Sequence, residues 1–129
     1  MADYTFTRTL DADLATTEDR VREALSAEGF GVLTEIDIQA TLKKKLDVDV
    51  AGYRILGACN PPLAHKAMQA EPRIGVMLPC NVILRDLGDG TTEVAAIDPV
   101  ASMAAVENDG LGEIADDVRQ RLQRVVAAL

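Results

Sequence analysis

The residues best suited to chemistry in this chain are its two cysteines, each followed directly by an asparagine. Cys59 precedes Asn60 and Cys80 precedes Asn81, and both pairs lie beside proline where an apolar run meets a predicted loop. Twenty residues separate the cysteines, which is not the close spacing of a zinc ribbon. Only the fold could bring them together, and we expect it to do so because both lie at loop-adjacent ends of strands.

Cys59 is predicted to end a strand directly before a helix. Asn60 is a suitable N-cap, and Pro61 then occupies the first helical position. A helix N-terminus carries partial positive charge and free N–H groups, which lower the pKa of a nearby thiol and attract anions. This geometry favours a reactive thiolate at Cys59. The alternative, for it and for Cys80, is a buried and inert thiol in the core.

His65 is the only histidine and falls in the early turns of the same predicted helix. Together with Cys59 and Cys80 it could bind a transition metal, with Glu35, Asp37 or water as the fourth ligand. The alternative is a solvated or structural histidine. The chain contains no Walker loop, GxGxxG or GxSxG motif, so no nucleotide cofactor is expected.

Glu35 and Asp37 lie two residues apart on a predicted strand, so their side chains share a face at a spacing of about 7 Å. Acid–base pairs use such separations. The alternative is a solvated strand face. If a helix covers these carboxylates they need partners, and Arg54 is one candidate.

The distribution of charge suggests where a ligand could bind. The net charge of −8 divides into −6 for residues 1–37, +4 for residues 38–85 and −6 for residues 86–129. The basic middle segment contains both cysteines and predicts a small anionic ligand, unless Lys43, Lys44 and Lys45 form only a solvated helix face. The acidic total and an aromatic content of 3% argue against binding to nucleic acid.

The N-terminal residues lack the charged and apolar regions of a signal peptide, and no apolar run approaches the ~18 residues of a membrane span. We therefore expect a cytoplasmic protein without a membrane partner, and a single domain over residues 1–129.

The elements that position these residues follow from hydrophobic periodicity and turn signals. Single strands separated by helices, with one tight hairpin at residues 88–90, predict an α+β fold: a two-layer sandwich in which helices cover one face of a mixed, mostly antiparallel sheet. Strands are expected at residues 3–10, 31–38, 53–59, 80–87 and 91–97, and helices from Thr16 or Thr17 to Gly29, at 39–46, at 61–70 and from Gly110 or Gly112 to the C-terminus.

The final helix carries a continuous apolar stripe that could either pack on the sheet or form the seam of a homodimer. Its members are Ile114, Val118, Leu122, Val125 and Leu129.

Several segments, in this order, resemble a known family. They are residues 31–37 (GVLTEID), residues 53–61 (YRILGACNP) followed by Ala64-His65, residues 78–82 (LPCNV) and Asp98-Pro99. The order and spacing are similar to those of the domain-of-unknown-function family numbered 302, over nearly the whole chain. The resemblance implies an α+β fold and a small bacterial or archaeal protein, often dimeric. It implies no reaction.

Three functional hypotheses follow. The first is a small-ligand or metal-binding module, whose site contains Cys59, Asn60, His65, Cys80 and Asn81, with Glu35 and Asp37 as neighbours. The second is a thiol redox or sulfur-handling protein that uses Cys59 and Cys80. The third is a dimeric structural or regulatory protein without small-molecule chemistry.

Overall fold

The computed structural model describes residues 3–129 and confirms the predicted α+β fold. Its elements, in chain order, are β1 (Thr5–Leu10), α1 (Leu14–Ala27), β2 (Gly31–Asp37), α2 (Ile38–Leu46), β3 (Tyr53–Cys59), α3 (Pro61–Ala70), the 3₁₀ helix η1 (Ile74–Met77), β4 (Cys80–Asp86), β5 (Thr92–Ile97), α4 (Pro99–Ser102) and α5 (Asp109–Ala127).

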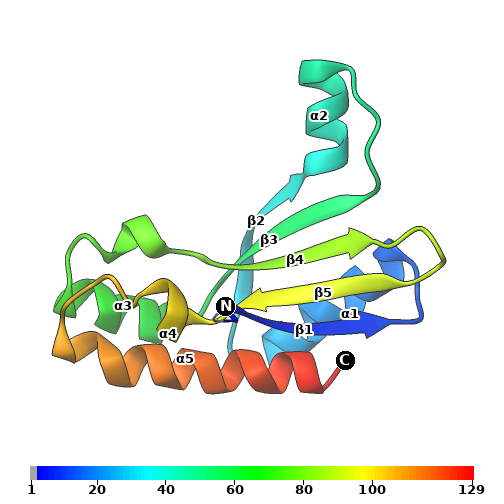
Figure 1. The fold of residues 1–129 in the computed structure, drawn as a ribbon. Coiled ribbons are helices and arrows are strands. Elements are labelled where there is room, and N and C mark those ends of the chain that lie inside the picture. Colours follow the sequence, from blue (N-terminus) through cyan, green and yellow to red (C-terminus); the bar gives the residue numbers. More distant parts are fainter. Residues whose placement is uncertain (1–2) are drawn as a thin grey trace.

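The five strands form one sheet in the order β1-β5-β4-β3-β2 (Figure 1). Each described pairing is antiparallel, so the sheet is not mixed as predicted. Antiparallel sheets can bury one face and leave the other open, and the strands here show the alternation that this requires. In β4, for example, Val82 and Leu84 are fully buried, whereas Asn81 and Arg85 are exposed.

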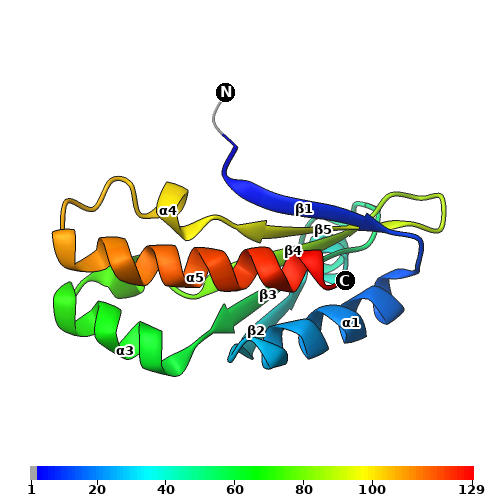
Figure 2. The same cartoon turned by 90° about the horizontal axis from the view of Figure 1, so that it is seen from below.

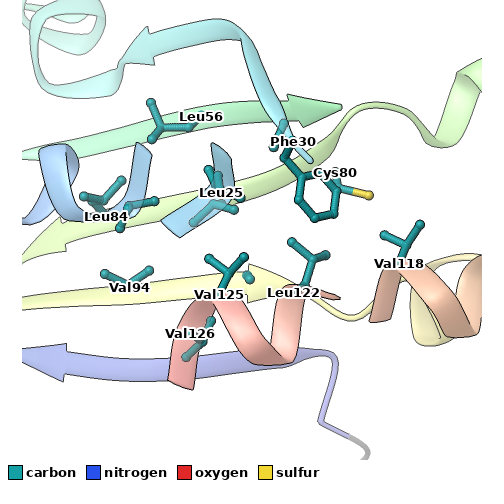
Figure 3. Close-up of a cluster of buried hydrophobic side chains, with 14 of the residues drawn as sticks. Leu25, Phe30, Leu56, Cys80, Leu84, Val94, Val118, Leu122, Val125 and Val126 are labelled. Carbon is teal, nitrogen blue, oxygen red and sulfur yellow. The ribbon is translucent and has the colours of Figure 1, made fainter. Parts of the chain in front are cut away.

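The core lies between one face of the sheet and the helices α1, α3 and α5 (Figure 2). Leu56 of β3 and Val94 of β5 meet Leu25 of α1 and Leu122 of α5, and all four are fully buried (Figure 3). The apolar stripe of α5 therefore packs on the sheet. The alternative prediction, in which that stripe forms a dimer seam, is wrong because its central residues are already covered within the chain.

A second, smaller layer of contacts lies at the end of the sheet from which α3 begins. Ala67 of α3, Ile74 of η1 and Leu111 of α5 form a buried cluster there. It fixes the position of η1 and hence of the segment that leads into β4.

The helix α2 and the loop that follows it form an arm that rises from the sheet on the side opposite α5 (Figure 1). Asp37 accepts a hydrogen bond from the backbone N–H of Ala40 at 2.9 Å, and Asp47 ends the helix in a left-handed conformation with φ of 54°. None of the nine α2 residues is buried.

Three local features differ from the sequence prediction. Asp13, and not Thr16 or Thr17, caps α1 by accepting a hydrogen bond from the backbone N–H of Thr16 at 2.8 Å. Asp98, the residue directly after the last strand, also caps the short helix α4 with its side chain. A bulge between Val32 and Thr34 breaks the predicted alternation of β2, so Val32 points to the core while Thr34 points to the open face.

Among the described residues, no helix combines the length and the apolar character needed to cross a bilayer.

Candidate ligand-binding site

A small cavity lies where β3 ends and β4 begins, with α3 and α5 as its other walls. Its volume is about 30 Å³, room for one or two water molecules. It opens to solvent on one side, and its walls are almost entirely apolar. Phe30, Leu63 and Val118 contribute to these walls, and no lining residue is charged.

Both cysteines line this cavity. Ala58 pairs directly with Cys80 across β3 and β4, so Cys59, the next residue, lies diagonally opposite Cys80. Figure 3 shows Cys80 beside Phe30 at one end of the core cluster. The fold thus brings the two residues to one cavity, as expected from their places at strand ends.

The thiols are free, and their surroundings favour the protonated form. Burial raises the pKa of Cys59, and it raises the pKa of Cys80 to about 11, with a smaller contribution from the nearby Cys59. Desolvation therefore disfavours the charged form at both cysteines, and this opposes the thiolate that the helix N-terminus favours at Cys59.

The start of α3 explains why the helix end does not offset this desolvation. Asn60 caps the helix as predicted, accepting a hydrogen bond from the backbone N–H of Leu63 at 3.2 Å. Pro61 and Pro62 have no N–H group, and the N–H of Ala64 already donates to the Asn60 carbonyl at 2.9 Å. No backbone donor of residues 61–64 is therefore left free to stabilise a thiolate or an anion.

His65 does not join the cysteines. Leu63 and Ala67 form the buried face of α3, and His65, two residues from each, is exposed on the other side of the helix. Nowhere in residues 3–129 do three or more His, Cys, Asp and Glu side chains gather so that they could hold a metal ion. The predicted metal site of Cys59, His65 and Cys80 is therefore not formed.

Glu35 and Asp37 also lie away from the cavity. Glu35 forms ion pairs with Arg22 and, at 3.3 Å, with Arg54, which was the predicted partner. Glu18 bridges the same two arginines, at 3.0 and 2.8 Å. Glu35 therefore joins β2 to α1 and β3, whereas Asp37 caps α2. The two carboxylates do not form the predicted acid–base pair.

Asn81 and the lysines of the middle segment are also outside the cavity. Asn81 is exposed on the open face of the sheet, in a shallow depression with Pro79 and Ile97. Lys43 lies on the arm, where it pairs with Asp47 and Asp49. The basic segment is thus spread over the surface and contributes no cation to the cavity walls.

Sequence reasoning missed Gly57, which lets Pro79 lie close to β3. An added Cβ on Gly57 would overlap the Thr34 hydroxyl and would lie 2.7 Å from Cγ of Pro79. Pro79 therefore rests directly on the backbone of β3, on the open face that Gly57 shares with Asn81, and this contact fixes the segment that leads into Cys80. A glycine inside a strand is a signal of such an approach.

The sequence also gave no indication that α5 and the α4–α5 connection complete the cavity. Ile114, Ala115 and Met103 contribute to its walls. Ile114 lies on the predicted apolar stripe, but periodicity alone does not say which strand ends the helix crosses.

Fold and site together define a class: an α+β protein with helices on one face of a five-stranded antiparallel sheet, and a small apolar cavity that contains two neutral thiols. The chain belongs to DUF302, a domain of unknown function, whose family model matches residues 6–129.

A solved structure described as an uncharacterized conserved DUF302 protein from Bacillus stearothermophilus is similar to this chain over 98% of both chains, with 28% sequence identity and a TM-score of 0.90. No curated protein matches the chain.

Proposed function

We propose that this chain is a small-ligand-binding module that takes a short, neutral, apolar group into the cavity beside Cys59 and Cys80. The observation that supports this most directly is the composition of the cavity walls: two thiols whose pKa burial raises, aliphatic and aromatic carbon, and Asn60 as the one amide side chain, without a charged residue.

Neutrality of the ligand follows from the cost of burying charge. An ion that enters an apolar cavity loses its hydration, which costs several kcal/mol or more unless the protein supplies partners. The first turn of α3 has no free N–H group, and the cations of the middle segment lie elsewhere. The small anionic ligand expected from the sequence is therefore not the ligand proposed for this cavity.

The volume limits what can enter. Binding sites for drug-sized ligands occupy roughly 300–1,000 Å³, whereas this cavity has about 30 Å³. A methyl, ethyl or thioether-sized group fits, either as a whole molecule or as the end of a larger one that remains in the open mouth. Sulfur and aromatic groups are polarisable and make favourable contacts with such groups.

Xenon is a suitable probe, because it is neutral and polarisable and enters dry apolar cavities. Amide chemical shifts in ¹⁵N–¹H NMR spectra, recorded at increasing xenon pressure, are expected to change saturably at Ala58, Leu63 and Cys80. Absence of a saturable change at these amides would contradict the proposal.

Two variants make the test specific. Ala115→Leu places a larger side chain in the cavity wall and is expected to abolish the xenon response, whereas Ala104→Leu, at an exposed position, should leave it unchanged. Cys80→Ala enlarges the cavity and should strengthen the response. A response that Ala115→Leu does not alter would assign xenon to another site.

A further inference from the structure

Three sulfur-containing side chains border the cavity at the ends of β3 and β4. Besides Cys59 and Cys80, Met103 lines it, from the turn that ends α4. The sequence holds two cysteines and four methionines, so three of these six side chains lie around a cavity of about 30 Å³. In Figure 3 the Cys80 sulfur points along the core toward the end where Val118 lies, and Val118 is also a wall of this cavity.

Only the fold brings these three side chains together. Cys59 ends β3 and Cys80 begins β4, one register step apart, so the hydrogen bonds between the strands fix both backbones. Met103 follows α4, which begins at its cap Asp98, and the Met103 N–H donates to the Pro99 carbonyl at 3.0 Å. A methionine side chain is unbranched and flexible, so its sulfur can adjust to a ligand that two fixed thiols hold.

The walls offer sulfur and almost no other donor. Among the described residues that line the cavity, none carries a carboxylate, an imidazole or a charge. The side-chain oxygen of Asn60 already accepts the N–H of Leu63. Mg²⁺ and Ca²⁺ take oxygen ligands, and Zn²⁺ takes four ligands in a tetrahedron, so these walls suit none of the three ions. Thiolate and thioether sulfur instead select Cu(I), a soft cation.

Binding of Cu(I) also leaves the cavity without added charge. Both thiols are free, and a thiol binds a metal as its thiolate. A Cu(I) ion that bonds to the Cys59 sulfur displaces the thiol proton to solvent, so one positive charge replaces another. Cys80 and Met103 then supply further sulfur lone pairs. The cost of taking the ion out of water is offset by these bonds, which the cavity offers to no hard cation.

Size and access fit a single ion. A volume of about 30 Å³ holds one or two water molecules, and one metal ion needs no more room than that. The cavity opens to solvent on one side, and Cys59 is half-buried whereas Cys80 is buried. An ion can therefore meet Cys59 first and reach Cys80 without an opening of the core.

From this arrangement we infer that Cys59, Cys80 and Met103 form a binding site for one Cu(I) ion. The site differs from the metal site predicted from the sequence, because the fold turns His65 outward and brings a methionine to the thiols instead. It goes beyond the apolar ligand proposed above and does not depend on it. The two ligands would compete, since a cavity of about 30 Å³ has no room for both.

Competition with the chromophoric Cu(I) chelator bicinchoninate, without oxygen and with excess glutathione to remove ions held by isolated thiols, tests this inference on the full chain. The wild type should take one Cu(I) per chain. Cys59→Ala and Cys80→Ala should each weaken binding at least about 100-fold, because loss of a residue that only orients a metal ligand already costs about 10–100-fold. Met103→Leu keeps the size but removes the sulfur and should weaken binding about tenfold. Met68→Leu, at an exposed methionine of α3, is the matched control and should change nothing.

Far-UV circular dichroism should confirm an intact fold of each variant. A wild type that takes no Cu(I) from the chelator would overturn the inference. Equal affinity of the wild type and Met103→Leu would also overturn it, as would binding that both cysteine variants retain. Cys80→Ala separates this inference from the proposed function, because it should weaken Cu(I) binding but strengthen the response to xenon. A xenon response in a chain without affinity for Cu(I) would support the apolar ligand and overturn the metal site.

Discussion

Replacing Gly57 by alanine is expected to destabilise the protein by about 1–2 kcal/mol. The added methyl group would overlap the Thr34 hydroxyl and lie 2.7 Å from Cγ of Pro79. Carbon atoms in contact normally lie about 3.5–4.0 Å apart, so Pro79 would have to move by roughly 1 Å. Overpacking of this kind costs about 1–3 kcal/mol. Alanine recovers about 0.5–1 kcal/mol of this, because glycine loses more conformational freedom in a strand.

Urea unfolding followed by far-UV circular dichroism measures this difference. Gly31→Ala is the matched control, because Gly31 lies in the neighbouring strand and an added Cβ there has no heavy atom within 4 Å. The control should be neutral or slightly stabilising, while Gly57→Ala should also lower the melting temperature by about 4–8 °C. Equal stability of the two variants would refute the account of Gly57. If overlap with Thr34 causes most of the loss of stability, the double variant Gly57→Ala/Thr34→Ala should recover most of it. The remaining loss is then due to the contact with Pro79.

Three further changes test the core, the thiols and the ion pairs. Leu122→Asp should unfold the chain, because it places an unpaired carboxylate at a fully buried position. Gln123→Asp, on the exposed side of α5, is the control and should change the free energy of unfolding by less than about 0.5 kcal/mol. Burial raises the pKa of Cys80 from its ordinary 9.0 to about 11, so between these values the folded state keeps a proton that the unfolded chain releases. The free energy of unfolding should therefore be constant below pH 9 and fall between pH 9 and 11, by up to about 2–3 kcal/mol. Cys80→Ala should remove this fall. Arg54→Met should lower stability by about 1 kcal/mol in low salt and by less in 1 M NaCl, because the variant loses the ion pair with Glu18; a salt-independent loss would assign the role of Arg54 to packing.

The elements next to the cavity could be predicted from the sequence because local signals agree there. The apolar run at residues 53–59 and the Asn60-Pro61 start of α3 predict the observed bounds of both elements. The approach of Cys59 to Cys80 followed from two strand ends that meet a loop.

The chemistry of the site could not be read from the same signals, although parts of it were present in the sequence. Leu63 and Ala67 lie four residues apart, which is enough to place His65 on the opposite side of α3. Pro62 removes a second donor from the helix N-terminus, and this weakens the stabilisation that the helix end could give to a thiolate.

The features of the fold and site that the sequence did not predict depend on contacts between distant segments. A bulge at Leu33 decides which residues of β2 face the core, and no local pattern announces it. The position of α5, which supplies Ile114, Ala115 and Val118 to the cavity walls, decides where the cavity closes. Both are set by packing, which periodicity does not determine.

The strand order has a consequence for how the chain acquires its structure during synthesis. β1 precedes the other four described strands in the chain, but its partner is β5, so Thr5 cannot pair until Ile97 has been made. β2, β3, β4 and β5 find their partners over much shorter separations. Pairing across so long a loop is slow, because the closure entropy precedes the gain from contacts. During synthesis, β1 therefore lacks its partner until Ile97 has been added, and its unpaired backbone is open to wrong pairing in that interval.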